Sequence, residues 1–421
     1  MKKITLLLAL LLTLTACNKN ANLTATNLMA GVNKNDITPI VIDSAPKSSA
    51  DKTAEIADLS LAILKKIHKG ENTLISPLSI ISALAMTANG AKKETLSQME
   101  GVFGADIGSL NEYLYAFQSY LPTAGKYKVS LANSIWFKDK KSLTVEKEFL
   151  QTNKDYYDAE VYKAPFDDST KNDINAWVNK KTDGQIKKLL EEKPPEDAVM
   201  YLINALSFDA EWQSIYHDIS VREGEFTAQD GNKKVVDFMH STEYGYIEGL
   251  NAAGFSKPYA DNKYSFVALL PEEGLAVSDF IASIDGKTLM DIIKNQRKDQ
   301  VYASIPKFVF EYSGELSGIL KELGIKDAFD EDAADFNSLG KSDEGNIFIS
   351  RVIHKTKIQV DEKGTRAGAV TAVEMKNGSS APAEPKRVNL NRPFFFMIVD
   401  NEFSMPIFMG VLNDAATNAA P

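Results

Sequence analysis

One stretch near the C-terminal end of the 421-residue chain limits its possible folds more than any other segment. Residues 346–360 have the apolar and β-branched character of a long strand, and residues 361–385 then abandon large apolar side chains for Gly, Ala, Thr, Ser and Pro. A segment of that composition is typically an exposed linker. A linker, however, has no reason to differ in kind between its odd and even positions, and this segment does.

The alternation gives the segment two faces. Arg366, Glu374 and Lys376 share one set of positions with small residues, whereas the other set is uncharged and free of glycine: Thr365, Ala367, Ala369, Thr371, Val373 and Met375. Because neighbouring side chains of a strand point to opposite faces, the extended segment would present one small, uncharged face. Such a face could enter between two existing strands without overpacking. We interpret the segment as a strand waiting for a sheet; a linker with chance alternation is the alternative.

The first residues are organised as a targeting segment. Lys2 and Lys3 precede apolar residues 4–14, a run too short to span a bilayer. Residues 14–17 (LTAC) resemble the bacterial lipoprotein box, in which cleavage precedes a lipidated cysteine. We expect residues 1–16 to be a signal peptide and Cys17, the only cysteine, to carry lipid. The protein would then be extracytoplasmic and anchored to the bacterial cell membrane, in the periplasm or at the cell surface. A plain secretory peptide and a buried helix are the alternatives.

The composition of the next segment predicts where the folded domain begins. Residues 17–50 are rich in Asn, Thr, Ser, Ala and Lys, which is typical of a flexible tether. A folded domain is predicted over residues 51–415, where a helical apolar spacing starts at Ile56. Pro77 is expected to open a second helix with Ser76 as its cap.

Short apolar runs and helical patterns mix irregularly in the rest of the chain, which predicts the α+β class. Helices are expected at residues 173–190 and 314–323. Strands are expected at residues 129–137, 200–212, 234–239, 264–270 and 394–400. The turns between the later strands favour antiparallel pairing over βαβ winding.

Several function classes are excluded by what the chain lacks. A formal net charge of -10 without a basic stripe argues against a nucleic-acid partner. There is no G-x-S-x-G nucleophile motif, and the four histidines (His68, His217, His240 and His354) have no metal-ligand spacing. We therefore expect neither an enzyme nor a bound metal or cofactor.

Four separated motifs connect the chain to a known family. They are EKGT at residues 362–365 followed by the Ala-rich run, NTLISPLS at residues 72–79, NALSF at residues 204–208 leading to Trp212, and PFF at residues 393–395 leading to FMG at residues 408–410. Over residues 54–415 the sequence resembles the serpin family. The resemblance implies one domain of three β-sheets and about nine helices, with an exposed reactive-centre loop over about residues 362–387.

The resemblance also implies a mechanism. A target peptidase cuts the loop, forms an acyl-enzyme, and is carried along as the loop inserts into the central sheet, so the uncut fold must be metastable. The expected partners are trypsin-, elastase- or subtilisin-like serine peptidases, with cysteine peptidases as an alternative, and the expected state is a monomer. The rival function is a non-inhibitory carrier or chaperone-like binder. Such members usually carry large or charged residues, or Pro, on the inserting face between Thr365 and Thr371, and this chain carries none.

The resemblance assigns roles to individual residues. The hinge of the loop would comprise Glu362, Gly364, Thr365, Ala367 and Ala369, with Thr365 first to insert. Arg366 and Gly368 depart from the family pattern, which usually has an acid and Ala there, but both lie on the predicted outer face.

Two further groups would act on the sheet. A hydrogen-bonded shutter beneath it would contain Ser76, Ser79, Asn204 and His354. A breach at its top would contain Trp212 and Lys307, with Lys307 paired to Glu362. For these serines the alternative is a simple helix cap, and for His354 an ordinary strand histidine.

The resemblance also implies a position for the scissile bond. Serpins are typically cut fourteen residues beyond the glycine that matches Gly364, which implies a cut between Gly378 and Ser379. A slip of a few residues would instead select Met375, Lys376 or Asn377. Because these residues suit different peptidase pockets, the sequence leaves the specificity open.

Overall fold

The computed structural model describes residues 23–41, 47–122, 125–140, 142–365 and 385–415. Within these ranges the chain forms nine α-helices, three large β-sheets and a small two-stranded ribbon. The expected α+β architecture of three sheets and about nine helices is confirmed.

The largest sheet has seven strands, and β6 (Met200–Glu211) runs through its middle. In spatial order the strands are β1 (Thr26–Asn27), β5 (Glu160–Ala164), β3 (Tyr127–Lys138), β6, β16 (Gly364–Thr365), β15 (Arg351–Val360) and β13 (Phe308–Glu315). β3 and β6 pair antiparallel along almost their full length, from Tyr127↔Ala210 to Phe137↔Met200. β6 is almost wholly buried because structure covers both of its faces.

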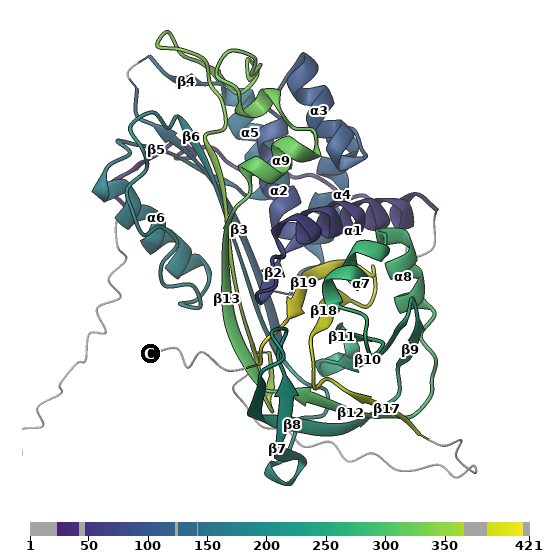
Figure 1. Ribbon diagram of the computed structural model, residues 1–421. Coiled ribbons are helices and arrows are strands. Elements are labelled where there is room, and N and C mark those ends of the chain that lie inside the picture. The colour runs from purple at the N-terminus through teal and green to yellow at the C-terminus, as the bar shows by residue number, and fades with distance from the viewer. Residues whose placement is uncertain (1–22, 42–46, 123–124, 141, 366–384, 416–421) are drawn as a thin grey trace, which may run out of the picture.

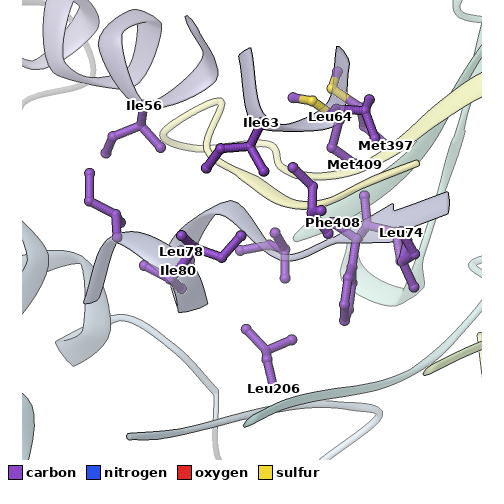
Figure 2. Close-up of a cluster of buried hydrophobic side chains, with 14 of the residues drawn as sticks. Ile56, Ile63, Leu64, Leu74, Leu78, Ile80, Leu206, Met397, Phe408 and Met409 are labelled. Atoms are coloured by element: carbon purple, nitrogen blue, oxygen red, sulfur yellow. The ribbon is translucent and has the colours of Figure 1, made fainter. Parts of the chain in front are cut away.

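The second sheet has six strands and lies in the core. Its order is β2 (Thr73–Ile75), β19 (Pro406–Leu412), β18 (Phe394–Asp400), β11 (Tyr264–Pro271), β10 (Ala252–Pro258) and β9 (Tyr246–Gly249). Every residue of β11, β18 and β19 is buried. Figure 2 shows how apolar side chains of this sheet, such as Phe408 and Met409, meet Ile63 and Leu64 of α1 (Lys47–Ile67) and Leu78 of α2 (Pro77–Ala88). Burial of this kind contributes about 25 cal/mol per Å² of apolar surface.

The third sheet has four strands and lies at one end of the molecule (Figure 1). Its order is β17 (Lys386–Asn389), β12 (Val301–Pro306), β8 (Lys233–Glu243) and β7 (Val221–Thr227). β17 runs parallel to β12. The chain thus leaves the central sheet at Thr365 and joins a different sheet at Lys386. The ribbon pairs β4 (Thr144–Val145) with β14 (Gly340–Lys341).

The helices are divided unequally between the two faces of the central sheet. On one side lie α1, α2, α3 (Lys93–Phe103), α4 (Ile107–Ser119) and α5 (Lys147–Tyr157), while α6 (Asp168–Lys181) is the one helix of the described residues on the other (Figure 1). α6 has its own apolar cluster, in which Ile174 and Trp177 pack with Trp136 and Tyr201 of the sheet. The remaining elements are α7 (Val277–Ser283), α8 (Gly286–Lys294), α9 (Ser317–Leu323) and the short 3₁₀ turns η1 (Asp218–Ser220), η2 (Ala260–Asn262) and η3 (Asp327–Phe329). No helix in the described ranges is long and apolar enough to cross a membrane.

The helix expected at residues 173–190 has different bounds in the structure. α6 starts earlier, at Asp168, because the side chain of Asp167 accepts hydrogen bonds from the backbone N–H groups of Ser169 and Thr170. It ends at Lys181, since Asp183 and Gly184 adopt positive φ angles of 50° and 77°. The apolar residues beyond Lys181 are buried as irregular chain rather than as helix.

The tether predicted for residues 17–50 is contradicted where the structure describes it. Residues 23–37, here called the N-terminal strap, lie along the body: Thr26 and Asn27 pair with β5 at the edge of the central sheet. Met29 is buried in the main core, and Asn35 donates two hydrogen bonds to Asp155 of α5, at 2.7 and 2.9 Å. Composition misled here because the backbone supplies the edge pairing and the polar side chains serve as hydrogen-bonding groups. The first helix also starts before residue 51, at Lys47.

Candidate functional site: an open central sheet and its hinge

The central sheet is open between β6 and β15. These strands pair in parallel from Tyr201↔Arg351 to Ala205↔Lys355. Beyond that point the two strands are no longer paired with each other, over residues 206–209 of β6 and 356–359 of β15. Thr365 then bridges the strands, opposite Ala210 on β6 and Val360 on β15. A cavity of about 220 Å³ lies at this gap, lined by Phe208, Lys357, Gln359 and Thr365 among others.

The hinge begins inside the sheet. Thr365 is 2% exposed, so the residue expected to insert first already occupies a strand position. Gly364 is required there because a Cβ atom would lie 2.0 Å from the carbonyl oxygen of Ala210. The resemblance placed this glycine in the hinge, and its close approach to β6 is the physical reason for it.

The turn that leads into the hinge, residues 361–364, is closed by Asp361. Its Oδ1 accepts hydrogen bonds from the backbone N–H of Lys363 at 2.9 Å and of Gly364 at 3.3 Å, and its own N–H donates to the carbonyl of Gly364 at 3.0 Å. Side-chain capping of this kind is typical of Asp in tight turns. Sequence reasoning missed Asp361, although an Asp three residues before a glycine is a recognisable turn signal.

Trp212 and Tyr216 hold the same turn from the other side. The indole Nε1 of Trp212 donates to the carbonyl of Asp361 at 2.8 Å, and the Trp212 backbone N–H donates to that of Lys363 at 2.9 Å. The backbone N–H of Tyr216 donates to the carbonyl of Glu362 at 2.8 Å. Three consecutive carbonyls of the turn are therefore fixed by two residues that follow β6.

The breach predicted around Trp212 and Lys307 is assembled in the structure. Lys307 Nζ lies 3.0 Å from Glu362 Oε2 and 3.9 Å from Asp237 Oδ2. Burial opposes ionisation of Glu362, but hydrogen bonds and the Lys307 ammonium outweigh it and hold its pKa below the usual value. Trp212 stacks on Tyr259 with ring centroids 4.4 Å apart, and the Tyr259 hydroxyl is 2.5 Å from Thr365 Oγ1.

The four residues predicted as the shutter come together beneath the sheet, and all are buried. His354 of β15 stands opposite Asn204 of β6, with Nδ1 3.4 Å from Asn204 Oδ1. The backbone N–H of Ser76 donates to His354 Nε2 at 3.2 Å, which places the ring proton on Nδ1. Burial lowers the pKa of His354 to about 3, so the ring is neutral.

Asn204 is the centre of this cluster. Its Oδ1 accepts from the Ser79 hydroxyl as well as from His354, and its Nδ2 donates to the Ser79 carbonyl and to Asn133 Oδ1. The amide thus uses all of its hydrogen-bonding capacity, as a buried polar group must. Sequence reasoning missed Asn133, whose only signal was an amide in the middle of a predicted strand. Ser76 stands at the N-cap of α2, but its side chain makes no capping hydrogen bond.

Some predicted site residues lie outside the described residues. They are Cys17 at the lipidation site, Ala367 and Ala369 in the hinge, and Met375, Lys376, Asn377, Gly378 and Ser379 around the scissile bond. Their assignments stay predictions. Among the residues that are described, no three His, Cys, Asp or Glu side chains gather as a metal site would require.

A larger pocket opens beside the breach, where its lining includes Gln213, the residue after Trp212. Its volume is about 980 Å³, and its lining includes Ser214, Tyr216, Ser256, Gln296 and Asn401. These side chains offer hydroxyl and amide groups around a space large enough for a small organic molecule.

Comparison with known proteins agrees with this geometry. A family model described as serpin (serine protease inhibitor) matches residues 54–415. Human leukocyte elastase inhibitor is 29% identical over 86% of this chain and 98% of its own. The thermophilic serpin tengpin in its native state has a TM-score of 0.86 and 48% identity, covering 93% of this chain and 99% of its own. Its latent state has a lower TM-score of 0.77, over 90% of this chain and all of its own, at 49% identity.

The fold and the site define a class of protein: an α+β domain whose central sheet is open at one end, where Gly364 and Thr365 lie between β6 and β15. The chain belongs to the serpin family. The family is described as one of protease inhibitors rather than of enzymes. Thyroxine-binding globulin, solved with thyroxine, shares the fold at 23% identity and a TM-score of 0.76, covering 87% of this chain and 99% of its own. Fold alone therefore does not specify inhibition.

Proposed function

We propose that this protein inhibits serine peptidases by trapping them as covalent acyl-enzymes while its cut loop inserts between β6 and β15. One observation carries the proposal: Gly364 and Thr365 already lie between these strands, directly above the unpaired stretch. The loop would continue from Thr365 into the gap, antiparallel to both strands. The small, uncharged residues at Ala367 and Ala369 suit the buried face of such a strand.

The driving force is the completion of the sheet. Residues 206–209 and 356–359 present backbone groups toward the gap, and an inserted strand would pair with both edges. Insertion would form on the order of ten new backbone hydrogen bonds, each contributing about 0.5–1.5 kcal/mol net. The uncut protein would therefore be metastable relative to the cut, inserted form.

Insertion must also separate the part of the sheet that is closed. The pairs from Tyr201↔Arg351 to Ala205↔Lys355 would have to part, and the Asn204–His354 contact lies among them. The shutter thus joins β6 and β15 through hydrogen bonds, and these can be exchanged for hydrogen bonds to the incoming strand. An apolar contact at the same place would offer the new backbone no partner.

The decisive experiment is incubation with trypsin-, elastase- and subtilisin-like peptidases followed by denaturing electrophoresis. A covalent complex is expected with at least one of them, and sequencing the released fragment would locate the cut relative to Gly378 and Ser379. A cysteine peptidase in the same series tests the alternative target class. Clean cleavage by every peptidase, without a complex, would refute trapping.

A substitution series sharpens this test. Thr365→Arg places a charged side chain at a position that is 2% exposed, so the variant is expected to be cleaved as a substrate. Lys363→Arg is the matched control, because Lys363 is exposed and two residues away. Complex formation by Thr365→Arg at the wild-type level would contradict insertion.

Ligand carriage is a second candidate function, favoured by the 980 Å³ pocket beside the breach. A carrier would form no covalent peptidase complex, and native mass spectrometry of the purified protein would show an added small molecule. The absence of charged or bulky residues on the inserting face between Thr365 and Thr371 favours inhibition over carriage.

We also propose that the protein is attached to the bacterial cell membrane through lipid on Cys17. The motif at residues 14–17 and the apolar run before it support this location. Cells fed a labelled fatty acid are expected to label the wild type and not Cys17→Ala, and the variant should leave the membrane fraction. Equal labelling of both would exclude this anchor.

A further inference from the structure

A buried ion pair lies directly behind the residues that hold the hinge turn. Lys257 of β10 and Glu243 at the end of β8 have side chains that are 2% and 9% exposed, with Nζ 2.9 Å from Oε1. Lys257 Nζ also donates to the carbonyl of Ser214 at 3.2 Å. Both charges are therefore almost fully removed from water.

The pair contacts the two residues that fix the turn. Lys257 Nζ lies 4.4 Å from the ring centroid of Tyr216 and 5.3 Å from that of Trp212, within the range of cation–π attraction. Glu243 Oε1 accepts a hydrogen bond from Ser241 Oγ at 2.6 Å. Ser241 Oγ in turn lies 3.1 Å from the Tyr216 hydroxyl oxygen. Lys257 thus contacts both aromatic rings, and Glu243 reaches the hydroxyl group of Tyr216 through Ser241.

Trp212 and Tyr216 in turn hold the carbonyls of residues 361, 362 and 363. The turn would have the same role before and after insertion, because it reverses the chain between β15 and the strand that starts at Gly364. A turn held in place before cleavage needs no ordering when the loop starts to insert.

Stability alone does not account for such a pair. Desolvation of two buried charges costs about as much as their attraction returns, and apolar residues of similar volume often leave a protein equally stable. Directional contacts are what an apolar replacement cannot supply. Here these contacts converge on Trp212 and Tyr216.

We propose that Lys257 and Glu243 are positioning residues for loop insertion: they hold Trp212 and Tyr216 so that the hinge turn is preformed when the peptidase cuts. The expected effect on trapping rests on the proposed function, but the positioning of Trp212 and Tyr216 is independent of any peptidase. Insertion competes with hydrolysis of the acyl-enzyme, so a looser turn diverts more encounters to simple cleavage.

The test replaces both charges with apolar side chains of similar size, in Lys257→Met/Glu243→Leu. Amide hydrogen exchange at Trp212 and Tyr216 is expected to accelerate at least about 10-fold relative to the rest of the central sheet. The ratio of cleaved to complexed protein is expected to rise several-fold, while the near-UV circular dichroism stays native-like. Glu243→Gln, which keeps the shape of the site, is expected to give a smaller effect in the same direction. Lys257→Arg, which keeps the positive charge, is expected to remain close to the wild type in both the exchange rates and the ratio of cleaved to complexed protein.

Lys263→Met is the matched control. Lys263 pairs with the buried Asp400 at 3.3 Å at the same end of the second sheet but has no contact with Trp212, Tyr216 or the hinge turn. It is expected to change neither readout.

Unchanged exchange at Trp212 and Tyr216 in the double variant would overturn the proposal, and so would an equal increase throughout the domain. If the double variant does not fold, the same comparison of amide exchange at Trp212 and Tyr216 is made on Glu243→Gln. If the wild type traps no peptidase, the proposed function fails, and the exchange measurement still decides on positioning.

Discussion

Asn204 and His354 face each other across the two strands that would have to part for a new strand to enter the sheet, with His354 Nδ1 3.4 Å from Asn204 Oδ1. His354 lies on β15 and Asn204 on β6, while Ser79 of α2 and Ser76, the residue before α2, lie beneath them. The closed part of the sheet is thus joined through side chains as well as through the backbone ladder. This arrangement makes the stability of the closed sheet sensitive to pH and to single substitutions.

The neutral state of His354 leads to a pH prediction. Its folded-state pKa of about 3 lies below the pKa of 6.5 of an unperturbed histidine, so between these values the unfolded chain binds a proton that the folded chain does not. Stability contributed by neutral His354 is therefore present above pH 6.5 and lost as the pH falls toward 3, at about 1.4 kcal/mol per pH unit. Denaturant unfolding of wild type and His354→Gln at pH 4, 5 and 6 is expected to show a shallower pH slope for the variant. Equal slopes would mean that His354 is not held neutral.

Asn204 and Asn133 allow a graded test of the cluster. Asn204→Ala removes an amide with four hydrogen-bonding contacts and leaves buried partners on β3, β15 and α2 unsatisfied, so a loss of about 3–5 kcal/mol is expected. Asn133→Ala removes one bond to the same amide, and a loss of about 1–3 kcal/mol is expected. Guanidinium unfolding measures both values. A milder effect for Asn204→Ala than for Asn133→Ala would show that Asn204 is not the centre of the network.

Gly364→Ala tests the close approach of the hinge to β6. The new methyl group would lie 2.0 Å from the Ala210 carbonyl oxygen, which belongs to rigid sheet backbone, so residues 364–365 are expected to leave the sheet. The variant should become sensitive to limited proteolysis near Thr365 and should lose complex formation. Gly318→Ala in α9 is the control, because no atom lies within 4 Å of its added methyl group. Wild-type protection of Gly364→Ala would contradict the packing described here.

The N-terminal strap is expected to contribute measurable stability through Asp155. Its carboxylate accepts hydrogen bonds from Asn35 N, Asn35 Nδ2 and Gln151 Nε2, so Asp155→Ala leaves these donors without their acceptor. A loss of about 1–3 kcal/mol and faster amide exchange at Asn35 are expected. Glu148→Ala, at an exposed position of the same helix, should stay within about 0.5 kcal/mol of wild type. If both variants behave alike, the strap is not held by Asp155.

Parts of the fold were predictable because they depend on local pattern. The strand expected at residues 394–400 has those bounds in β18, since a continuous apolar run buried on both faces is unambiguous. The strand expected at residues 129–137 agrees with β3 to within two residues at each end. Shutter and breach residues were predicted from the family resemblance, and the structure brings each set together.

Other features could not be predicted because their partners are distant in sequence. Asn133 acts through Asn204, which lies 71 residues away, and Thr24 of the strap donates to Asp173, which lies 149 residues away. Nothing near Lys257 in the sequence indicates that it would be buried against Glu243 beneath two aromatic rings. Such pairings exist only once the sheets have packed.

The amino-acid sequence alone determined the α+β class, the motifs that identify the family, and a loop whose alternating small residues suit a strand, because side-chain periodicity and composition are local properties. Only the tertiary structure decided that the loop starts inside the sheet, that the strap is part of the body, and which buried groups surround the hinge. Those outcomes depend on which backbone edges and polar atoms are left without partners after packing, and a linear pattern does not contain that information.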